Sequence, residues 1–261
     1  GIQKYGFDDI RNVIERSSAR ETAMRVALGS ICKKLLFDLG IVIYSRVISI
    51  GSIKDTTHLK TNDYEKLHSK IDQSPLRCVD KNIETKMIKI IDGCIEKGDS
   101  IGGEIEIHAA GIPYGLGDYT QWDKKLHSLI ASLLLSINGF KSLEIGSSKD
   151  ELKSFGSNFH DEIFWKDNQY ARGSNHAGGI EGGMTNAQPI IIRAHMKPIP
   201  TLRKPLASID IMSKKEKLAH KERTDSCAVP AASIIAEHML SFALVDSLLI
   251  KFGGDSMLEL K

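Results

Sequence analysis

The sequence has 261 residues, of which 41% are hydrophobic and 26% charged, and these proportions are typical of a globular protein large enough to bury a sizeable core. Thirty-five Lys and Arg against 33 Asp and Glu give a formal net charge of +2, which argues against an extended nucleic-acid surface. The four cysteines lie far apart without a C-x-x-C pair, so we expect reduced thiols in a cytoplasmic protein and neither a disulfide framework nor a metal site. We also expect no apolar run long enough to span a bilayer, no leader sequence and no membrane partner.

A motif rich in serine and arginine opens the first predicted helix. Residues 1–16 are polar and are predicted to form a loop. Ser18, followed three residues later by Glu21, is typical of a capping box, which predicts a helix that starts just after Ser18 and ends at Gly40. Arg16 and Arg20 flank this helix start, where free N–H groups and the helix dipole favour an anion, so the motif indicates a phosphate site. The alternative is an ordinary capped helix whose arginines pair with nearby carboxylates.

Hydrophobic periodicity predicts the remaining elements. Strands are expected over residues 41–53, 102–110, 141–145 and 189–196, and helices over 64–71, 84–97, 122–137 and 230–252. The last helix is apolar around most of its girth, so we expect it to be central and buried. In the second strand, Glu104, Glu106 and His108 are expected on a wet or functional face, where a lone histidine is more often a surface or hydrogen-bonded residue than a general base. Residues 111–117, 147–172 and 214–222 are predicted connections, the last of them a solvated run of charges.

A glycine-rich loop precedes the strand at 189–196. Gly178, Gly179, Gly182 and Gly183 fall within six residues, so this loop either approaches a ligand closely or is simply a flexible connection. No G-x-G-x-x-G opens a helix here and no G-K-[ST] follows, which excludes the Rossmann and P-loop fingerprints. Residues 197–201, Lys-Pro-Ile-Pro-Thr, are predicted to form a stiff extended segment.

Taken in order, these motifs resemble the chorismate synthase family over nearly the whole chain. The segments that carry the resemblance are residues 4–6, 15–23, 115–117, 143–146, 175–183, 197–201 and 223–227. The variants at residues 15–16 and 225–232 resemble one bacterial subgroup of that family.

The resemblance implies a fold and a reaction. The implied fold is α/β (α+β), a single domain over residues 1–261 built as a sandwich of antiparallel sheets with outer helices and assembled as a homotetramer. The implied reaction is the anti 1,4-elimination of phosphate from 5-enolpyruvylshikimate 3-phosphate to give chorismate, in the shikimate pathway of aromatic amino acid biosynthesis. Reduced FMN is the implied cofactor, used without net redox change and associated with NADPH, and the implied partner is the small-molecule substrate, with no nucleic acid.

Carried over residue by residue, the resemblance also implies a site. The residues implied to bind FMN are Arg16, Ser17, Ser18, Asn138, Gly139, Gly182, Lys197, Pro198, Ile199, Pro200, Thr201 and Arg223. Arg20 is implied to bind the phosphate of the substrate, and Asp225 to manage the proton at the flavin nitrogen as the catalytic acid. The alternative for Asp225 is a cap for the helix that begins near Pro230.

The sequence departs from the family pattern in one respect. Two family histidines, one in a Gly-Glu-Ser-His-Gly stretch and one shortly before Lys-Tyr-Gly, would lie upstream of Gly1, and none of the nine histidines here matches them by motif. The chain is therefore expected to lack the N-terminal segment of the family, as a fragment or processed form, or to be a divergent protein that retains the flavin site alone. The hypotheses left open are an enzyme of the shikimate pathway, a catalytically silent module that binds FMN or phosphate, and a nucleotide-binding regulator without flavin.

Overall fold

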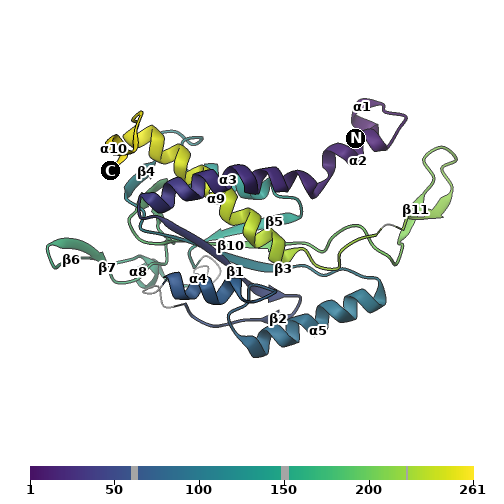
Figure 1. Ribbon diagram of the computed structural model, residues 1–261, viewed down its shortest axis with the longest axis horizontal. Helices are drawn as coiled ribbons and strands as arrows, with labels where there is room; N and C mark the ends of the chain where they lie inside the picture. Colours follow the sequence, from purple (N-terminus) through teal and green to yellow (C-terminus); the bar gives the residue numbers. More distant parts are fainter. Residues whose placement is uncertain (60–63, 148–152, 222) are drawn as a thin grey trace.

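The computed structural model describes residues 1–59, 64–147, 153–221 and 223–261, and its centre is an antiparallel sheet (Figure 1). The strand order is β2 (Ile53–Lys54), β1 (Val42–Ile50), β3 (Gly103–Ala110), β10 (Ile190–Met196) and β5 (Phe140–Ile145). The helices α3 (Thr22–Asp38), α6 (Leu126–Leu135) and α9 (Val229–Phe252) form a layer over one face of this sheet. The helices α4 (Tyr64–Asp72) and α5 (Lys81–Lys97) lie beside β1 and β2, away from that layer. The mixed α/β class with antiparallel sheets is thus confirmed.

Smaller elements project from this centre. A second sheet has the order β4 (Tyr114–Gly117), β9 (Met184–Asn186) and β8 (Ile180–Glu181). Two hairpins, β6–β7 (Ile163–Lys166 and Gln169–Arg172) and β11–β12 (Ala207–Ile209 and Glu216–Leu218), project at opposite ends of the molecule (Figure 1). The short helices are α1 (Ile2–Tyr5), α2 (Arg11–Ser17), the 3₁₀ turn η1 (Ala19–Glu21), α8 (Gly156–Phe159) and α10 (Met257–Leu260).

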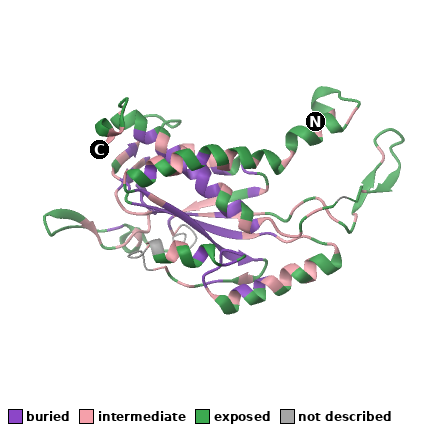
Figure 2. Ribbon diagram, viewed as in Figure 1, coloured by how far each residue is buried: buried purple, intermediate pink, exposed green. Residues whose placement is uncertain are grey.

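The core lies between the sheet and α9, as the sequence predicts. Alternate residues of β3, Ile105 and Ile107, are at most 1% exposed and belong to the same apolar cluster as Ala236 and Leu240 of α9. The central place of α9 is visible as the purple helix against the purple strands in Figure 2. Among the described residues, α9 is also the one helix long and apolar enough to cross a membrane. The expectation that no apolar run reaches that length is therefore wrong. Most of the helix is buried in the core, where apolar residues are needed on every side.

The helix start near Ser18 differs from the prediction. Residues 1–16 contain α1 and α2 and are therefore not a loop. The Ser18 hydroxyl oxygen accepts a hydrogen bond from the Arg20 N–H (3.3 Å), which caps the turn η1, and α3 begins only at Thr22. Glu21 does not reach back to Ser18, because its carboxylate binds the Arg25 guanidinium one turn ahead (2.8 Å).

Other local predictions are also wrong. Residues 111–117 include a strand, β4, and residues 147–172 include α8 and the β6–β7 hairpin, although the part at 148–152 lies outside the described residues. The face of β3 that carries Glu104, Glu106 and His108 is not wet: these side chains are 6%, 4% and 4% exposed. Burial of Glu106 is tolerable because Arg46 and Arg193, on the two neighbouring strands, pair with its carboxylate.

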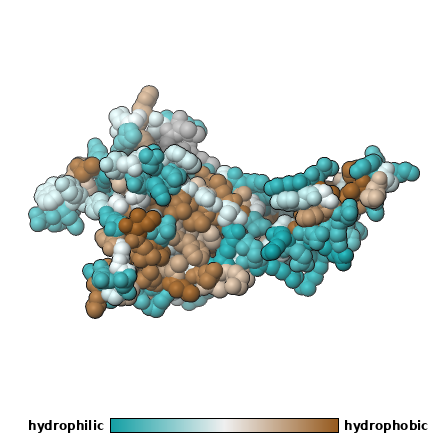
Figure 3. All heavy atoms as spheres, turned by 90° about the horizontal axis from the view of Figure 1, so that it is seen from above, coloured by the Kyte–Doolittle hydropathy of each residue, from teal (hydrophilic) through white to brown (hydrophobic). Residues whose placement is uncertain are grey.

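The outer face of the helical layer is apolar in part. Met24, Leu28 and Ile31, at intervals of four and three residues along α3, are 63%, 52% and 69% exposed. Figure 3 looks onto this layer and shows hydrophobic (brown) atoms gathered over the middle of the molecule, whereas the part that projects at one end is mostly hydrophilic (teal). A patch of this kind is larger than scattered single hydrophobic residues on a surface would produce.

Candidate cofactor and substrate site

Contacts between remote segments bring most of the predicted site residues to one end of the sheet. The Asn138 side-chain amide donates to the Ser17 carbonyl oxygen (3.2 Å), which joins the end of α2 to the turn before β5. The Lys197 N–H donates to the Gly139 carbonyl oxygen (2.9 Å), which joins that turn to the end of β10. Gly139 has φ +88°, a conformation that suits glycine in this tight turn.

A second set of contacts adds the segment that carries Arg223 and Asp225. The Ser100 hydroxyl donates to the Ile199 carbonyl oxygen (2.7 Å), and the Thr201 and Thr224 hydroxyl oxygens lie 2.7 Å apart. The Ile101 N–H donates to the Ser226 carbonyl oxygen (2.8 Å). Residues 197–201 and 223–226 therefore run side by side, as the prediction of one shared site requires.

Four cationic side chains gather at this end, and we refer to Arg16, Arg20, Lys197 and Arg223 as the cationic end. All four are exposed. Within the described residues, none of the four side chains has an ion pair or hydrogen-bond partner; Arg25 is the arginine that pairs with Glu21. The alternative of arginines neutralised by nearby carboxylates is thus not what the structure shows, and these cations remain available to an anion.

Asp225 lies at the edge of the same region. It is exposed, and the helix α9 has Ala228 at its N-cap with no side-chain cap. The alternative of Asp225 as the cap of this helix is therefore wrong, because the helix begins at Val229, four residues later. Its carboxylate is accessible to a ligand next to Arg223.

Gly182 does not join the cationic end within one chain. It occupies the exposed turn between β8 and β9 with φ +60°. The glycine loop is bonded to the start of β10, where the Ile191 N–H donates to the Gly178 carbonyl oxygen (3.3 Å), whereas Lys197 follows the end of that strand. A strand of seven residues spans about 20 Å, so the loop and residues 197–201 do not line one pocket of a single chain.

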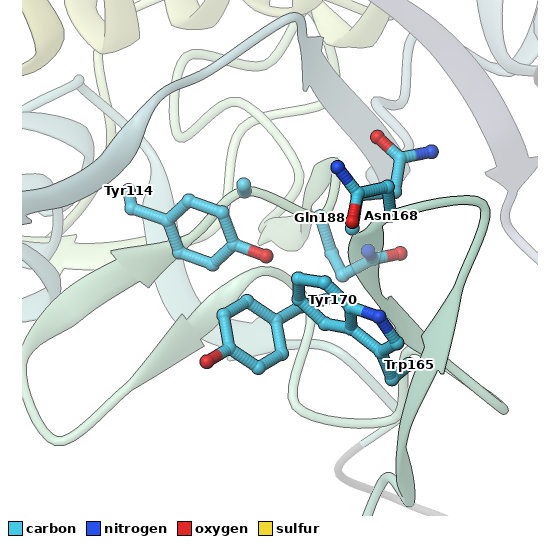
Figure 4. Close-up of a pocket in the computed structure, with 7 residues that line it drawn as sticks. Tyr114, Trp165, Asn168, Tyr170 and Gln188 are labelled. Atoms are coloured by element: carbon cyan, nitrogen blue, oxygen red, sulfur yellow. The ribbon is translucent and has the colours of Figure 1, made fainter.

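Two hollows in the described surface lie away from the cationic end. A cavity of about 500 Å³ opens between the β6–β7 hairpin and β4, with Tyr114, Trp165, Tyr170 and Gln188 in its lining (Figure 4). Another lies between α9 and the end of α3, with Leu39, Leu248 and Phe252 in its lining. Neither contains a residue of the predicted site. By the chemistry of its donors, the cationic end fits the phosphate of FMN or of a substrate.

A buried charge centre that the sequence analysis missed lies within the sheet. The carboxylate of Glu106 contacts the Arg46 Nε (3.0 Å) and the His108 Nε2 (2.9 Å) with one oxygen and the Arg193 Nε (2.9 Å) with the other. Burial alone would raise the pKa of Glu106, but the hydrogen bond from His108 and the charge of Arg46 outweigh it and hold that pKa far below its usual range. The signal in the sequence was an arginine in each strand that flanks β3.

Tyr44 closes this charge centre on one side. Its ring stacks on His108 (centroids 4.9 Å apart, planes 6° apart), and burial raises the pKa of its phenol. The centre joins β1, β3 and β10 by side chains in addition to the backbone ladder, and its carboxylate is fully paired. We therefore assign it to the stability of the sheet.

Comparisons with known proteins point to one family. Residues 1–249 match the family model described as chorismate synthase. The chain is 48% identical to "Chorismate synthase 2" of Bacillus cereus over all of this chain and 67% of the relative, and 49% identical to the chorismate synthase of Alkaliphilus metalliredigens over all of this chain and 68% of the relative. A crystal structure of chorismate synthase superposes with a TM-score of 0.85 at 40% identity and covers all of this chain and 72% of its own.

The chain spans about two thirds of the length of the curated relatives it matches. The family model matches the segments that form the cationic end. The identity of 48% to the first of these relatives is far higher than a shared fold alone requires. This chain belongs to the chorismate synthase family.

Proposed function

We propose that this protein acts as a carbon–oxygen lyase that eliminates phosphate from 5-enolpyruvylshikimate 3-phosphate to give chorismate. In this 1,4-elimination the carbon–oxygen bond to phosphate breaks, a proton is lost from the far carbon, and a new double bond forms. The observation that carries the proposal is the cationic end, where four unpaired cations from remote segments lie near one exposed carboxylate, Asp225. Family membership supports the same reaction.

Each residue has a role in this proposal. Arg20 binds the phosphate that leaves, because a guanidinium stabilises the developing phosphate dianion through paired N–H donors. Arg16, Lys197 and Arg223 hold the phosphate of reduced FMN, and the segment at 197–201 positions it by its proline-restricted backbone. Asp225 accepts and returns a proton beside the flavin nitrogen.

The cofactor and the assembly are part of the proposal. When bound, reduced FMN would supply transient electron density to the substrate without net oxidation, and NADPH would be a suitable reductant to keep it reduced. Asn138, Gly139, Ser17 and Ser18 stay predicted contacts of FMN, and Gly182 stays one as a contact supplied by a different chain of the assembly. We further propose that the protein is a cytoplasmic homotetramer and binds no nucleic acid.

The proposal is tested by an anaerobic assay of the protein expressed from its full reading frame. Reduced FMN and the substrate are added, and chorismate and phosphate are measured together. We expect equal amounts of both products and no net consumption of reduced flavin. Flavin binding without either product would favour a silent FMN-binding module, and ATP binding without flavin binding would favour a nucleotide-binding regulator.

A further inference from the structure

The segment between Thr201 and Thr224 forms an arm that projects beside the cationic end. We call residues 202–223 the basic arm. It contains the β11–β12 hairpin, which extends to the right in Figure 1, on the same side as α1 and α2. The two threonines that flank the arm are joined by their hydroxyl groups (2.7 Å), and the Ala219 N–H donates to the Leu206 carbonyl oxygen (2.9 Å). The arm therefore starts after Thr201 and ends with Arg223, and both residues belong to the predicted site.

The arm carries more positive charge than the whole protein. It has seven Lys and Arg against three Asp and Glu, a net charge of +4, whereas the chain as a whole carries +2. The remaining residues together are therefore net negative. The excess of positive charge on the arm favours the approach of a doubly charged phosphate from its side of the molecule.

Most of this positive charge is not neutralised locally. Asp210 shapes the hairpin turn, where its carboxylate accepts from the Ser213 N–H (2.9 Å) and pairs with Lys217 (3.5 Å). The hydrogen bonds from Ser213 and the charge of Lys217 lower the pKa of Asp210 to about 2. Over the described part of the chain, the remaining arm cations have no ion-pair partner: they are Arg203, Lys204, Lys214, Lys215, Lys221 and Arg223.

We propose that the basic arm attracts anionic ligands and speeds their arrival at the cationic end, and this inference rests on the proposed function. The ligands share one chemistry, a phosphate group on a small molecule. Long-range attraction raises association rates, leaves dissociation rates nearly unchanged and is screened by salt. A solvated hairpin without a role is the alternative, and its charges would leave association unaffected.

The test uses oxidised FMN as the probe and stopped-flow fluorescence as the readout, with ionic strength varied from about 10 mM to 1 M. The arm variant is Lys214→Glu with Lys215→Glu, which takes the net charge of the arm from +4 to 0. The control is Lys153→Glu with Lys166→Glu, an equal change in total charge at exposed sites just before α8 and in the β6–β7 hairpin, which lie at the opposite end of the molecule from the β11–β12 hairpin. All four lysines are exposed, so these variants should fold.

We expect the arm variant to bind FMN about tenfold more slowly at low salt and within twofold of the parent at 1 M salt. The control should stay within about threefold of the parent at low salt, and both should keep the parent dissociation rate. Equal association rates for arm and control variants, or a change confined to dissociation, would overturn the inference and leave the proposed function standing. Absence of FMN binding by the parent at every salt concentration would overturn the proposed function and the inference together.

Discussion

Replacement of Glu237 by glutamine should destabilise the fold by more than any exposed charge change. Glu237 lies in the middle of α9, and its side chain is 3% exposed. One carboxylate oxygen accepts from the Ser45 N–H (2.8 Å), the Ser45 hydroxyl (2.8 Å) and the Arg77 guanidinium (2.6 Å), and the other contacts Lys33. Glutamine has nearly the same shape, but its NH₂ group must face one of these donors.

The magnitude follows from the charges left behind. Removal of one partner of a buried ion pair costs about 3–5 kcal/mol. Arg77 keeps its contact with Asp72, and Lys33 is 25% exposed and can turn to water, so we expect the lower part of that range, about 3 kcal/mol. Urea unfolding followed by circular dichroism should show a midpoint lowered by about 1 M. Asp246→Asn, an exposed change in the same helix, is the control and should alter stability by less than about 0.5 kcal/mol. A loss below about 1 kcal/mol for Glu237→Gln would refute the reasoning.

Five further changes test the site and the sheet. Arg20→Ala should weaken substrate binding about tenfold or more and FMN binding less, as measured by separate titrations. Asp225→Asn should keep flavin affinity and lose most of the turnover, as measured in the anaerobic assay. Because the pKa of Glu106 is lowered in the folded state, its contribution to stability should be complete above the usual glutamate pKa and should fall as the pH drops below that value. Urea unfolding between pH 7 and pH 3 should therefore show a smaller loss of unfolding free energy for Glu106→Gln than for the parent. Gly146→Ala should destabilise by more than about 2 kcal/mol, since φ is +70° and a Cβ would meet the His176 carbonyl oxygen at 1.9 Å. Gly182→Ala, with φ +60° and open space, should cost about 1 kcal/mol in the same unfolding assay.

Each of these predictions has an outcome that would contradict it. Equal substrate affinity of parent and Arg20→Ala would remove that residue from the phosphate site. Unchanged turnover of Asp225→Asn would remove its catalytic role. Parallel pH curves for parent and Glu106→Gln would show that this carboxylate keeps its ordinary pKa, and equal stability of the two glycine variants would show that the close approach at Gly146 is relieved cheaply.

The strands and long helices were predictable because each repeats a local pattern. Alternation in β3 and the apolar girth of α9 depend on neighbours in the sequence, and both elements are confirmed within a few residues. The capping box failed because Glu21 had a second partner, Arg25, on the next turn. Burial of Glu106 depends on Arg46 and Arg193, which lie 60 and 87 residues away in the chain. No local pattern reports such pairs.

The candidate site was predictable in part for the same reason. The family motifs fixed which segments matter, and the contacts of Asn138, Gly139 and Thr201 bring most of them to one end. Gly182 lies far from residues 197–201 because its loop adjoins the start of β10, whereas those residues follow the end of that strand. This separation is a property of topology that no motif encodes.

The hydroxyl contact between Thr201 and Thr224 also makes the arm a closed loop whose interior can vary. Its two ends meet whatever lies between them, so the entropy of closure changes by only about 0.6 kcal/mol when the number of enclosed residues doubles or halves. Shortened or lengthened hairpins should therefore be accommodated with little thermodynamic penalty to the sheet. Evolution can thus adjust the reach and composition of this appendage independently of the folding of the rest of the chain.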